Sequence, residues 1–357
     1  MLLVGVKTYN LEIKMSSIIP VDNLLGLTLE NDWKVIEKIT ENPKGTGGSF
    51  SSGYKVKKAD KVAYLKALDF SEAFGSLDPP RRLQELTEAY NFERDLLIKC
   101  RDRKLSKVIH PLCDGSIQVP GLPEGIGRVY YLIFDLADGD IRYVKDTFKK
   151  LNIAFVFRSL HNTAVGLEQL HKIEIAHQDL KPSNVLVFKD ESKITDLGRA
   201  ADKNNGFVYD SIEMPGDRNY SPIEQYYKFH FSGDFTEKYA GDMYLLGSLF
   251  FFFFTGMTAT QTFFLKTRSL HIKLTNVFTQ DLPELKYVFN EMLRDFFVTI
   301  SKIMNNKNSS ETINLIKTLC FPDPRERGES TGNRYSLERT ISKLDLLARR
   351  AEVELNE

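Results

Sequence analysis

The sequence predicts an α+β protein of two lobes, the first built mainly of strands around one long helix and the second mainly of helices. Strand-like patterns are concentrated in the first part, at 33–40, 61–69 and 128–140. Helical spacing dominates the remainder, and the pattern changes near 137–145. A length of 357 residues is enough for about two domains of ~100–200 residues each.

Each element of the first lobe has a local signal. "WKVIEKIT" (33–40) alternates apolar and polar residues, and "KVAYLKALD" (61–69) reads as a second strand after a loop rich in Gly and Ser. "RVYYLIFDLADGD" (128–140) is an apolar strand that ends in a polar turn. Residues 79–100 are expected to form a long helix, with Asp78 as N-cap and prolines at the first helical positions.

The second lobe is predicted from helical patterns. The expected helices lie within "FVFRSLHNTAVGLEQLH", "GDMYLLGSLFFFFF", "LPELKYVFNEMLRDFFVTISKIM" and "SLERTISKLDLLARRAEVEL". The most apolar run, 245–256, has barely half of the about 20 residues that a spanning helix needs, so we expect a buried core helix. Segment 257–285 matches no pattern.

Composition excludes several classes of function. Basic and acidic residues balance at 48 each, which gives no support to binding of nucleic acid or of an anionic membrane by net charge. Cys100, Cys113 and Cys320 are scattered, which favours reduced thiols and a cytoplasmic location. The six histidines show no zinc-site spacing. Nothing in the sequence indicates an oligomeric state.

The beginning of the chain is neither a convincing signal peptide nor a membrane span. Its apolar residues are interrupted by Lys7, Glu12 and Lys14. Met1 and Met15 are both candidate starts.

Lys66 and Glu93 are the first candidate functional pair. Glu93 shares one helix face with Leu86, Tyr90 and Leu97, and an acid on an apolar face needs a partner unless it reaches water at the rim. Lys66 lies in an otherwise apolar strand and needs a partner too.

The Gly/Ser loop before that strand is a weaker signal. Gly45, Gly47, Gly48 and Gly53 would let backbone N–H groups approach phosphate oxygens. The loop does not fit G-x-G-x-x-G, because Phe50 stands at the third glycine, and an ordinary hairpin turn is the alternative.

The strongest signal is "HQDLKPSN" at 177–184. Asp179 and Lys181 flank one residue, so their side chains point the same way in an extended loop. "VLVF" and "KITD" follow as two short antiparallel strands, which would bring Asp196 back beside Asn184. Carboxylate and amide oxygens suit Mg²⁺. Asp179 would accept a hydroxyl proton and Lys181 would counter the charge of a moving phosphoryl group. The alternative is a polar turn that hydrogen-bonds to itself.

These motifs in this order resemble the eukaryotic-like serine/threonine protein kinases, over about residues 31–330. Besides "HQDLKPSN" for the catalytic loop, the segments that carry the resemblance are "YLK", "FERDLL", "TDLGRA" (195–200), "GDRNYSPIE" (216–224), "DMYLLG" (242–247) and "DPRER" (323–327). The resemblance implies a bilobal protein-kinase-like fold with a small antiparallel sheet. The implied division is 1–30 as an N-terminal extension, 31–136 as the ATP-binding lobe, 137–330 as the catalytic lobe and 331–357 as a C-terminal helix.

The resemblance also implies a role for each site residue. Lys66 would hold the α- and β-phosphates of ATP, and Glu93 would orient Lys66. Gly45, Gly47, Gly48, Ser49 and Phe50 would cover the phosphates; Asp135 and Ala137 would offer backbone groups to adenine, with Leu186 under the base. Asp179 would be the catalytic acid/base, Lys181 would steady the γ-phosphoryl group, and Asn184 and Asp196 would hold Mg²⁺. Asp242 would brace the catalytic loop, and Glu224 and Arg327 would form a structural ion pair.

Four positions depart from the family pattern. Gln178 stands where an Arg normally meets an activation-loop phosphate, so we expect activity without that phosphorylation. Tyr64 replaces a small residue two before Lys66 and would reshape the adenine pocket; Asp217 replaces a Thr and would repel acidic substrates. Ile223 replaces a proline, which would alter loop stiffness.

The leading interpretation is a kinase that phosphorylates a hydroxyl, most simply of Ser or Thr, on a protein substrate. One alternative is a small-molecule kinase on the same fold. The other is a catalytically weak pseudokinase that binds nucleotide as a scaffold, an alternative supported by Tyr64 and Asp217.

Overall fold

The computed structural model describes residues 19–39, 51–147, 150–189, 191–206, 214–330 and 332–356. These residues form two compact units. The strand unit runs from residue 19 to Arg101 and includes His110–Ala137; the helical unit comprises Asp102–Ile109 and runs on from Asp138.

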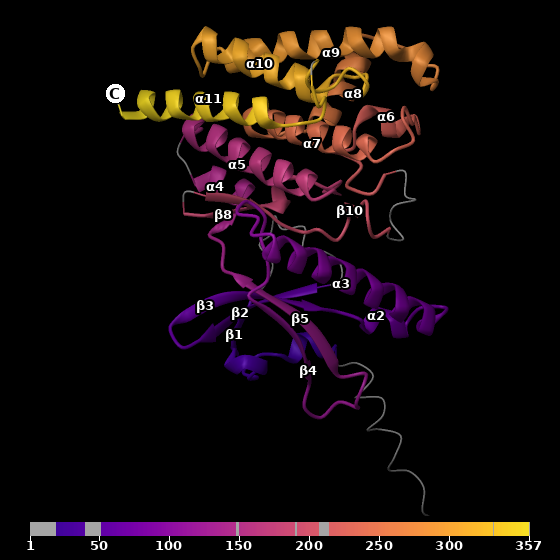
Figure 1. The fold of residues 1–357 in the computed structure, drawn as a ribbon, viewed down its shortest axis with the longest axis vertical. Helices are drawn as coiled ribbons and strands as arrows, with labels where there is room; N and C mark the ends of the chain where they lie inside the picture. Colours follow the sequence, from indigo (N-terminus) through magenta and orange to yellow (C-terminus); the bar gives the residue numbers. More distant parts are fainter. Residues whose placement is uncertain are drawn as a thin grey trace, which may run out of the picture. The chain divides into compact units, whose positions relative to one another are not determined.

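The strand unit is built around a five-stranded antiparallel sheet in the order β1-β2-β3-β5-β4 (Figure 1). Its strands are β1 Lys34–Lys38, β2 Ser51–Lys58, β3 Lys61–Leu68, β4 Cys113–Gln118 and β5 Arg128–Asp135. The unit also contains the 3₁₀ helices η1 Pro20–Asn23 and η2 Glu30–Asp32 and the helices α2 Ser71–Phe74 and α3 Pro79–Asp102. The predicted strands and the predicted long helix are therefore present.

Strand alternation separates the two faces of this sheet. Ala63, Leu65 and Ala67 of β3 are buried in the apolar core of the unit, together with Trp33 and Tyr54. The alternate residues of β3, which include Lys66, are partly buried or exposed on the opposite face. At the start of α3 the Asp78 carboxylate accepts a hydrogen bond from the Arg81 amide at 3.3 Å, as expected for an N-cap.

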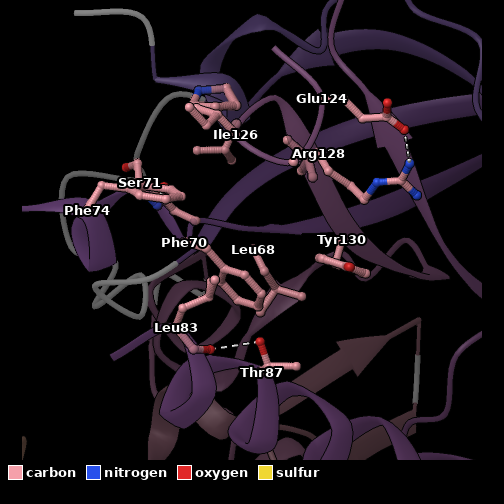
Figure 2. Close-up of a pocket in the computed structure, with 15 residues that line it drawn as sticks. Leu68, Phe70, Ser71, Phe74, Leu83, Thr87, Glu124, Ile126, Arg128 and Tyr130 are labelled. Carbon is pink, nitrogen blue, oxygen red and sulfur yellow. Dashed lines mark hydrogen bonds and ion pairs between the residues drawn. The ribbon is translucent and has the colours of Figure 1, made fainter. Parts of the chain in front are cut away.

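A pocket of about 390 Å³ opens in the strand unit beside the first turns of α3 (Figure 2). Leu83 and Thr87 of α3, Leu68 of β3 and Tyr130 of β5 contribute to its lining. None of the candidate site residues lines this pocket.

The helical unit carries two small antiparallel sheets and eight described helices. The sheets are β6-β8-β9 (Gly139–Asp140, Val185–Phe188, Glu191–Ile194) and β10-β7 (Ala201–Asp202, Ile175–Ala176). The helices are α4 Ile141–Thr147, α5 Ile153–Lys172, α6 Ile223–Tyr226, α7 Thr236–Thr255, α8 Ala259–Ser269, α9 Phe278–Ile300, α10 Asn306–Cys320 and α11 Glu338–Asn356, and η3 Pro182–Asn184 is a further 3₁₀ turn. Helix α11 packs along α5 (Figure 1).

Helix α7 is the predicted buried core helix. Phe250 and Phe251 are fully buried, and the helix ends at Gly256, whose φ of 76° is the left-handed conformation that glycine adopts easily. Among the described residues no single helix has the length and apolar character to cross a membrane; α7 and α8 meet that test only as a pair bent by 73°.

The longer helices α8 and α10 were not predicted from the sequence, and neither were the short helices α2, α4 and α6. Segment 257–285 contains α8 and the start of α9, and α8 begins with a capping box in which Thr258 and Gln261 bond each other's backbone. That T-x-x-Q pattern is the local signal that identifies α8. Helix α10 was missed because its first turns are polar, and its apolar residues at helical spacing, Leu315, Ile316 and Leu319, begin only beyond the middle of the helix.

Candidate active site

The strand unit contains the predicted Lys66–Glu93 ion pair. The Lys66 ammonium lies 2.8 and 2.9 Å from the two carboxylate oxygens of Glu93. The side chain of Glu93 is 9% exposed and that of Lys66 is 22% exposed. A carboxylate buried to this degree is stabilised only when a cation and its hydrogen bonds accompany it. Strand β3 and the apolar face of α3 therefore hold one another in register through this pair.

The residues expected at the base of a nucleotide lie at the end of β5 and in β8. Asp135 is the last residue of β5, and its carboxylate pairs with Lys61 at 2.8 Å. Ala137 is the last residue of the strand unit. Leu186 lies in the helical unit, on the partly buried face of β8 opposite Lys193 of β9. The loop residues Gly45, Gly47, Gly48, Ser49 and Phe50 lie outside the described residues.

In the helical unit, Asp242 of α7 anchors the backbone of the predicted catalytic loop by hydrogen bonds. The Asp242 carboxylate is fully buried and accepts hydrogen bonds from the backbone N–H groups of His177 and Gln178, both at 2.8 Å. It also lies 2.9 Å from Nε2 of His171. Gln178 has a φ of 62°, which costs about 1–3 kcal/mol for a residue other than glycine. The Asp242 bonds therefore stabilise a strained turn that presents Asp179.

Asp179 is the centre of the polar cluster in this loop. Its side chain accepts a hydrogen bond from the Lys181 ammonium at 2.9 Å, as the shared direction of the two side chains predicted. Its backbone carbonyl accepts a bond from the Asn184 amide at 2.9 Å. The residue is only 7% exposed, so these bonds fix the carboxylate direction.

The predicted hairpin brings the chain back to Asn184 one residue before Asp196. Strands β8 and β9 pair Val185 with Ile194, and the Thr195 amide donates to the Asn184 carbonyl at 3.0 Å. Asp196 follows with a φ of 64°, a conformation that turns the chain sharply after the strand.

The fit of this set to Mg²⁺ follows from its donors. Asn184 and Asp196 offer the amide and carboxylate oxygens that Mg²⁺ prefers. Among the residues that the structure describes, no group of three or more His, Cys, Asp or Glu side chains is arranged to hold a metal ion unaided. A small set nevertheless suits Mg²⁺, which is usually bound by one or two carboxylates together with substrate phosphates.

Asp217 contributes in a way that the sequence did not reveal. The expected repulsion of acidic substrates concerns its carboxylate, and the structure adds a second contact, because the Asp217 backbone N–H donates to Oδ1 of Asp179 at 3.0 Å. Its own carboxylate accepts a bond from the Asn219 amide at 2.9 Å. Gly216 permits this approach, because a Cβ there would lie 2.6 Å from the Gln178 carbonyl oxygen.

Two neighbouring side chains complete the surroundings of the loop. The Gln178 side chain accepts from Lys238 at 3.3 Å and donates to the Arg199 carbonyl at 3.2 Å. Burial, reinforced by the nearby carboxylates of Asp217 and Asp179, raises the pKa of Tyr220 to about 12. The Tyr220 hydroxyl therefore keeps its proton at neutral pH.

The predicted Glu224–Arg327 pair is present and buried. Two guanidinium nitrogens of Arg327 lie 2.7 and 2.9 Å from the two Glu224 oxygens. Arg327 is 0% exposed and also donates to the carbonyls of Ala240 and Phe321. This pair ties the segment around α6 to α7 and to the loop after α10.

Comparisons with known proteins agree with this geometry. A protein kinase domain model matches residues 44–332. Mitogen-activated protein kinase 11 of Arabidopsis thaliana is 24% identical over 51% of this chain and 45% of its own length. Cyclin-dependent kinase 7 of Xenopus laevis is 29% identical over 43% of this chain and 40% of its own length, and extracellular signal-regulated kinase 1 of Dictyostelium discoideum is 30% identical over 40% and 24%.

The chain spans less than half the length of each of these relatives. The domain model, in contrast, covers most of the chain, and the antiparallel sheet unit and the helical unit are the parts of the predicted bilobal fold. The predicted resemblance and fold class are confirmed: this chain belongs to the protein kinase family.

Proposed function

We propose that this protein transfers the γ-phosphoryl group of MgATP to a hydroxyl group of a protein substrate, with Asp179 as catalytic acid/base. The observation that carries the proposal is the fixed Asp179 carboxylate, held by Lys181 and by the Asp217 amide. A buried carboxylate with defined donors is suited to orient a hydroxyl group and to receive its proton.

The other site residues act through binding and charge. When bound, MgATP supplies the phosphoryl group and a metal charge that offsets the developing negative charge. Lys66, held by Glu93, binds the α- and β-phosphates, while Lys181 stabilises charge on the transferred group. Asn184 and Asp196 are the residues that would hold Mg²⁺. The family resemblance gives Gly45, Gly47, Gly48, Ser49 and Phe50, which lie outside the described residues, the role of covering the phosphates, and it gives Asp135, Ala137 and Leu186 the role of binding the base.

The acceptor is inferred to be Ser or Thr of a protein. The relatives named above are protein kinases, and the Glu224–Arg327 pair joins the segment after the catalytic loop to the core as the family resemblance implies. The scattered cysteines support a cytoplasmic location.

A nucleotide-binding scaffold is the second candidate, and the observation that favours it is the bulky Tyr64 on the same face of β3 as Lys66.

The test is transfer of radiolabel from ATP to a generic basic protein, compared between the wild type, Asp179→Asn and Asp196→Ala. Both substitutions should abolish labelling while ATP still protects the Asp179→Asn protein against thermal unfolding. Asp295→Asn is the control. Asp295 is 69% exposed on α9, and its ion-pair partner within the described part of the chain is Lys266.

The outcomes separate the candidates. Equal labelling by Asp179→Asn and wild type would overturn the role of Asp179. Thermal stabilisation of the wild type by MgATP without any transfer would favour the scaffold. Transfer to a sugar or an antibiotic but never to protein would favour a small-molecule kinase.

A further inference from the structure

The turn formed by residues 217–221 begins with a donor to the catalytic carboxylate. The Asp217 N–H donates to Oδ1 of Asp179 at 3.0 Å. The turn is closed on itself, because the Asp217 carbonyl accepts hydrogen bonds from the amides of Tyr220 at 2.9 Å and Ser221 at 3.1 Å. The Ser221 hydroxyl donates to the same carbonyl at 3.3 Å. A closed turn of this kind is locally rigid, so the contacts at its far end also set the position of the Asp217 N–H.

Two buried threonines at the start of α8 hold the far end of this turn. Thr258 is 3% exposed, and its hydroxyl donates to the Asn219 carbonyl at 2.5 Å. Thr260 is 1% exposed, and its hydroxyl donates to the Ser221 carbonyl at 2.9 Å and lies 3.3 Å from the Tyr220 carbonyl. Side chains from α8 therefore bond the carbonyls of three successive turn residues. All of these residues belong to the helical unit.

The direction of the hydrogen bonds at Thr260 follows from the groups around it. The Thr260 hydroxyl lies 3.0 Å from the hydroxyl of Tyr244 on α7. A backbone carbonyl can only accept, so the single proton of Thr260 is directed at Ser221, and Tyr244 has to donate to Thr260. Burial raises the pKa of Tyr244 well above its ordinary value, so this donor proton is present at neutral pH. A relay of hydrogen bonds therefore runs from Tyr244 through Thr260 to the turn.

The start of α8 is itself fixed and can serve as an anchor. Helix α8 packs against α7 (Figure 1). The Ala259 amide donates to the fully buried Ser248 hydroxyl of α7 at 3.0 Å. Thr258 also caps α8 by accepting a hydrogen bond from the Gln261 amide at 2.9 Å. Because α7 carries Asp242, which bonds the backbone of the catalytic loop, both the loop and the turn are positioned from α7.

We propose that Thr258 and Thr260 are positioning residues for phosphoryl transfer. Their hydroxyls hold the turn at 217–221 so that the Asp217 N–H fixes the direction of the Asp179 carboxylate. A carboxylate that receives a proton is effective only when it is held in the reactive direction. The two threonines act through the turn, and this inference rests on the proposed function. The alternative is that their hydroxyls satisfy buried carbonyl groups and stabilise the fold alone.

The experiment compares Thr260→Val with the wild type, both as the full chain, in steady-state phosphorylation of a generic basic protein. Valine keeps the shape of threonine and removes the hydroxyl, so kcat should fall by about tenfold, a part of the ~10²–10⁴-fold that a positioned base contributes. The KM for ATP should stay unchanged, because the proposed nucleotide contacts are untouched. Thr260→Ser, which keeps the hydroxyl, should have the kcat of the wild type. Tyr244→Phe should lower kcat less than Thr260→Val, because Thr260 still donates to Ser221.

Thr267→Val is the matched control on the same helix. Thr267 is 7% exposed, and its hydroxyl donates to the Phe263 carbonyl of α8 at 2.9 Å. This substitution also removes a buried hydroxyl hydrogen bond, but it leaves the turn at 217–221 untouched, so kcat should equal that of the wild type. A wild-type kcat in Thr260→Val, or an equal loss in both valine variants, overturns the inference.

Hydrogen exchange of the Asp217 amide gives a readout that does not depend on activity. In Thr260→Val this amide should exchange about fivefold faster than in the wild type and in Thr267→Val, because the turn is less firmly held. Unchanged exchange overturns the inference even when kcat falls. If Thr260→Val does not fold, Thr258→Gly is measured in the same way, because glycine is tolerated as an N-cap and lacks the hydroxyl that bonds Asn219.

The proposed function fails separately. A wild type that binds MgATP but transfers no phosphate contradicts the proposed function, whereas exchange of the Asp217 amide still shows whether Thr260 holds the turn. Transfer by the wild type together with a wild-type kcat in Thr260→Val contradicts the inference about the threonines alone.

Discussion

The Lys66–Glu93 pair of the strand unit and the Glu224–Arg327 pair of the helical unit have similar geometry but different surroundings. Both place two nitrogen–oxygen contacts between 2.7 and 2.9 Å. Arg327 is 0% exposed, and its N–H groups also donate to the carbonyls of Ala240 and Phe321. Lys66, in contrast, is 22% exposed.

The difference shows how one kind of interaction can serve two purposes. An enclosed guanidinium whose hydrogen bonds go to the protein itself has a structural role. An ammonium group that is held by its acid and still reaches solvent can bind an added phosphate. Burial separates the two roles, and the following predictions test that separation.

The largest effect is expected for Arg327→Ala. Removing the guanidinium leaves Glu224 buried without its cation, so the free energy of unfolding should fall by about 3–5 kcal/mol. Urea denaturation measures this loss. Lys286→Ala, which breaks an exposed pair with Glu326, should cost less than about 1 kcal/mol. A loss no larger than that of the control would contradict the structural role.

Lys66→Met should instead impair activity more than stability. Loss of a preorganised cation at the phosphates should lower the rate of phosphoryl transfer by about 10²–10³-fold. The unfolding free energy should change less than in Arg327→Ala, because Lys66 is 22% exposed whereas Arg327 is fully buried. Phosphorylation rates and urea denaturation are measured on the same samples. Lys57→Met on β2, an exposed position, is the control.

Asp323→Asn tests whether the charge of the Asp323 carboxylate contributes to the free energy of unfolding, and the dependence of that contribution on pH. Burial alone would raise the pKa of Asp323, but hydrogen bonds from the Arg325 side chain and backbone outweigh burial and lower it. The carboxylate therefore stabilises the fold at pH values above its unfolded pKa of about 3.9, and this contribution disappears as the pH falls through the lower folded pKa.

At neutral pH the Asn variant should be less stable by about 1–2 kcal/mol. The gap from wild type should close as the pH falls below about 4. Urea denaturation at a series of pH values measures the gap. A gap that is constant with pH would show that the carboxylate charge contributes nothing.

The smallest effect is expected from phosphatase treatment. Position 178 carries a neutral glutamine in place of the arginine that would bind a phosphate. The Gln178 side-chain amide accepts a hydrogen bond from Lys238 and donates one to the Arg199 carbonyl. Activity after treatment should equal that of an untreated sample in the same phosphorylation assay. Complete loss of activity would show that the helical unit needs an added charge after all.

Local patterns were sufficient for much of the fold and of the candidate site. The strand pattern at 61–69 predicted β3 and a partner for Lys66, and helical spacing placed Glu93 with Tyr90 on one face of α3, which is buried. The spacing of Asp179 and Lys181 predicted that these two side chains point the same way, and the hairpin after the loop was predicted as well. These predictions succeeded because strand and helix periodicities determine side-chain direction over a few residues.

Only the tertiary structure decided the contacts between distant segments. The His171 ring beside Asp242, the Asp217 amide on Asp179 and the Tyr64 ring over Gly53 depend on strand register and helix packing. Helix α10 has polar first turns and was not predicted, and its apolar side is buried against α7 in the folded unit. A sequence pattern shows which way a side chain points, whereas the packing of the whole unit determines what it meets there.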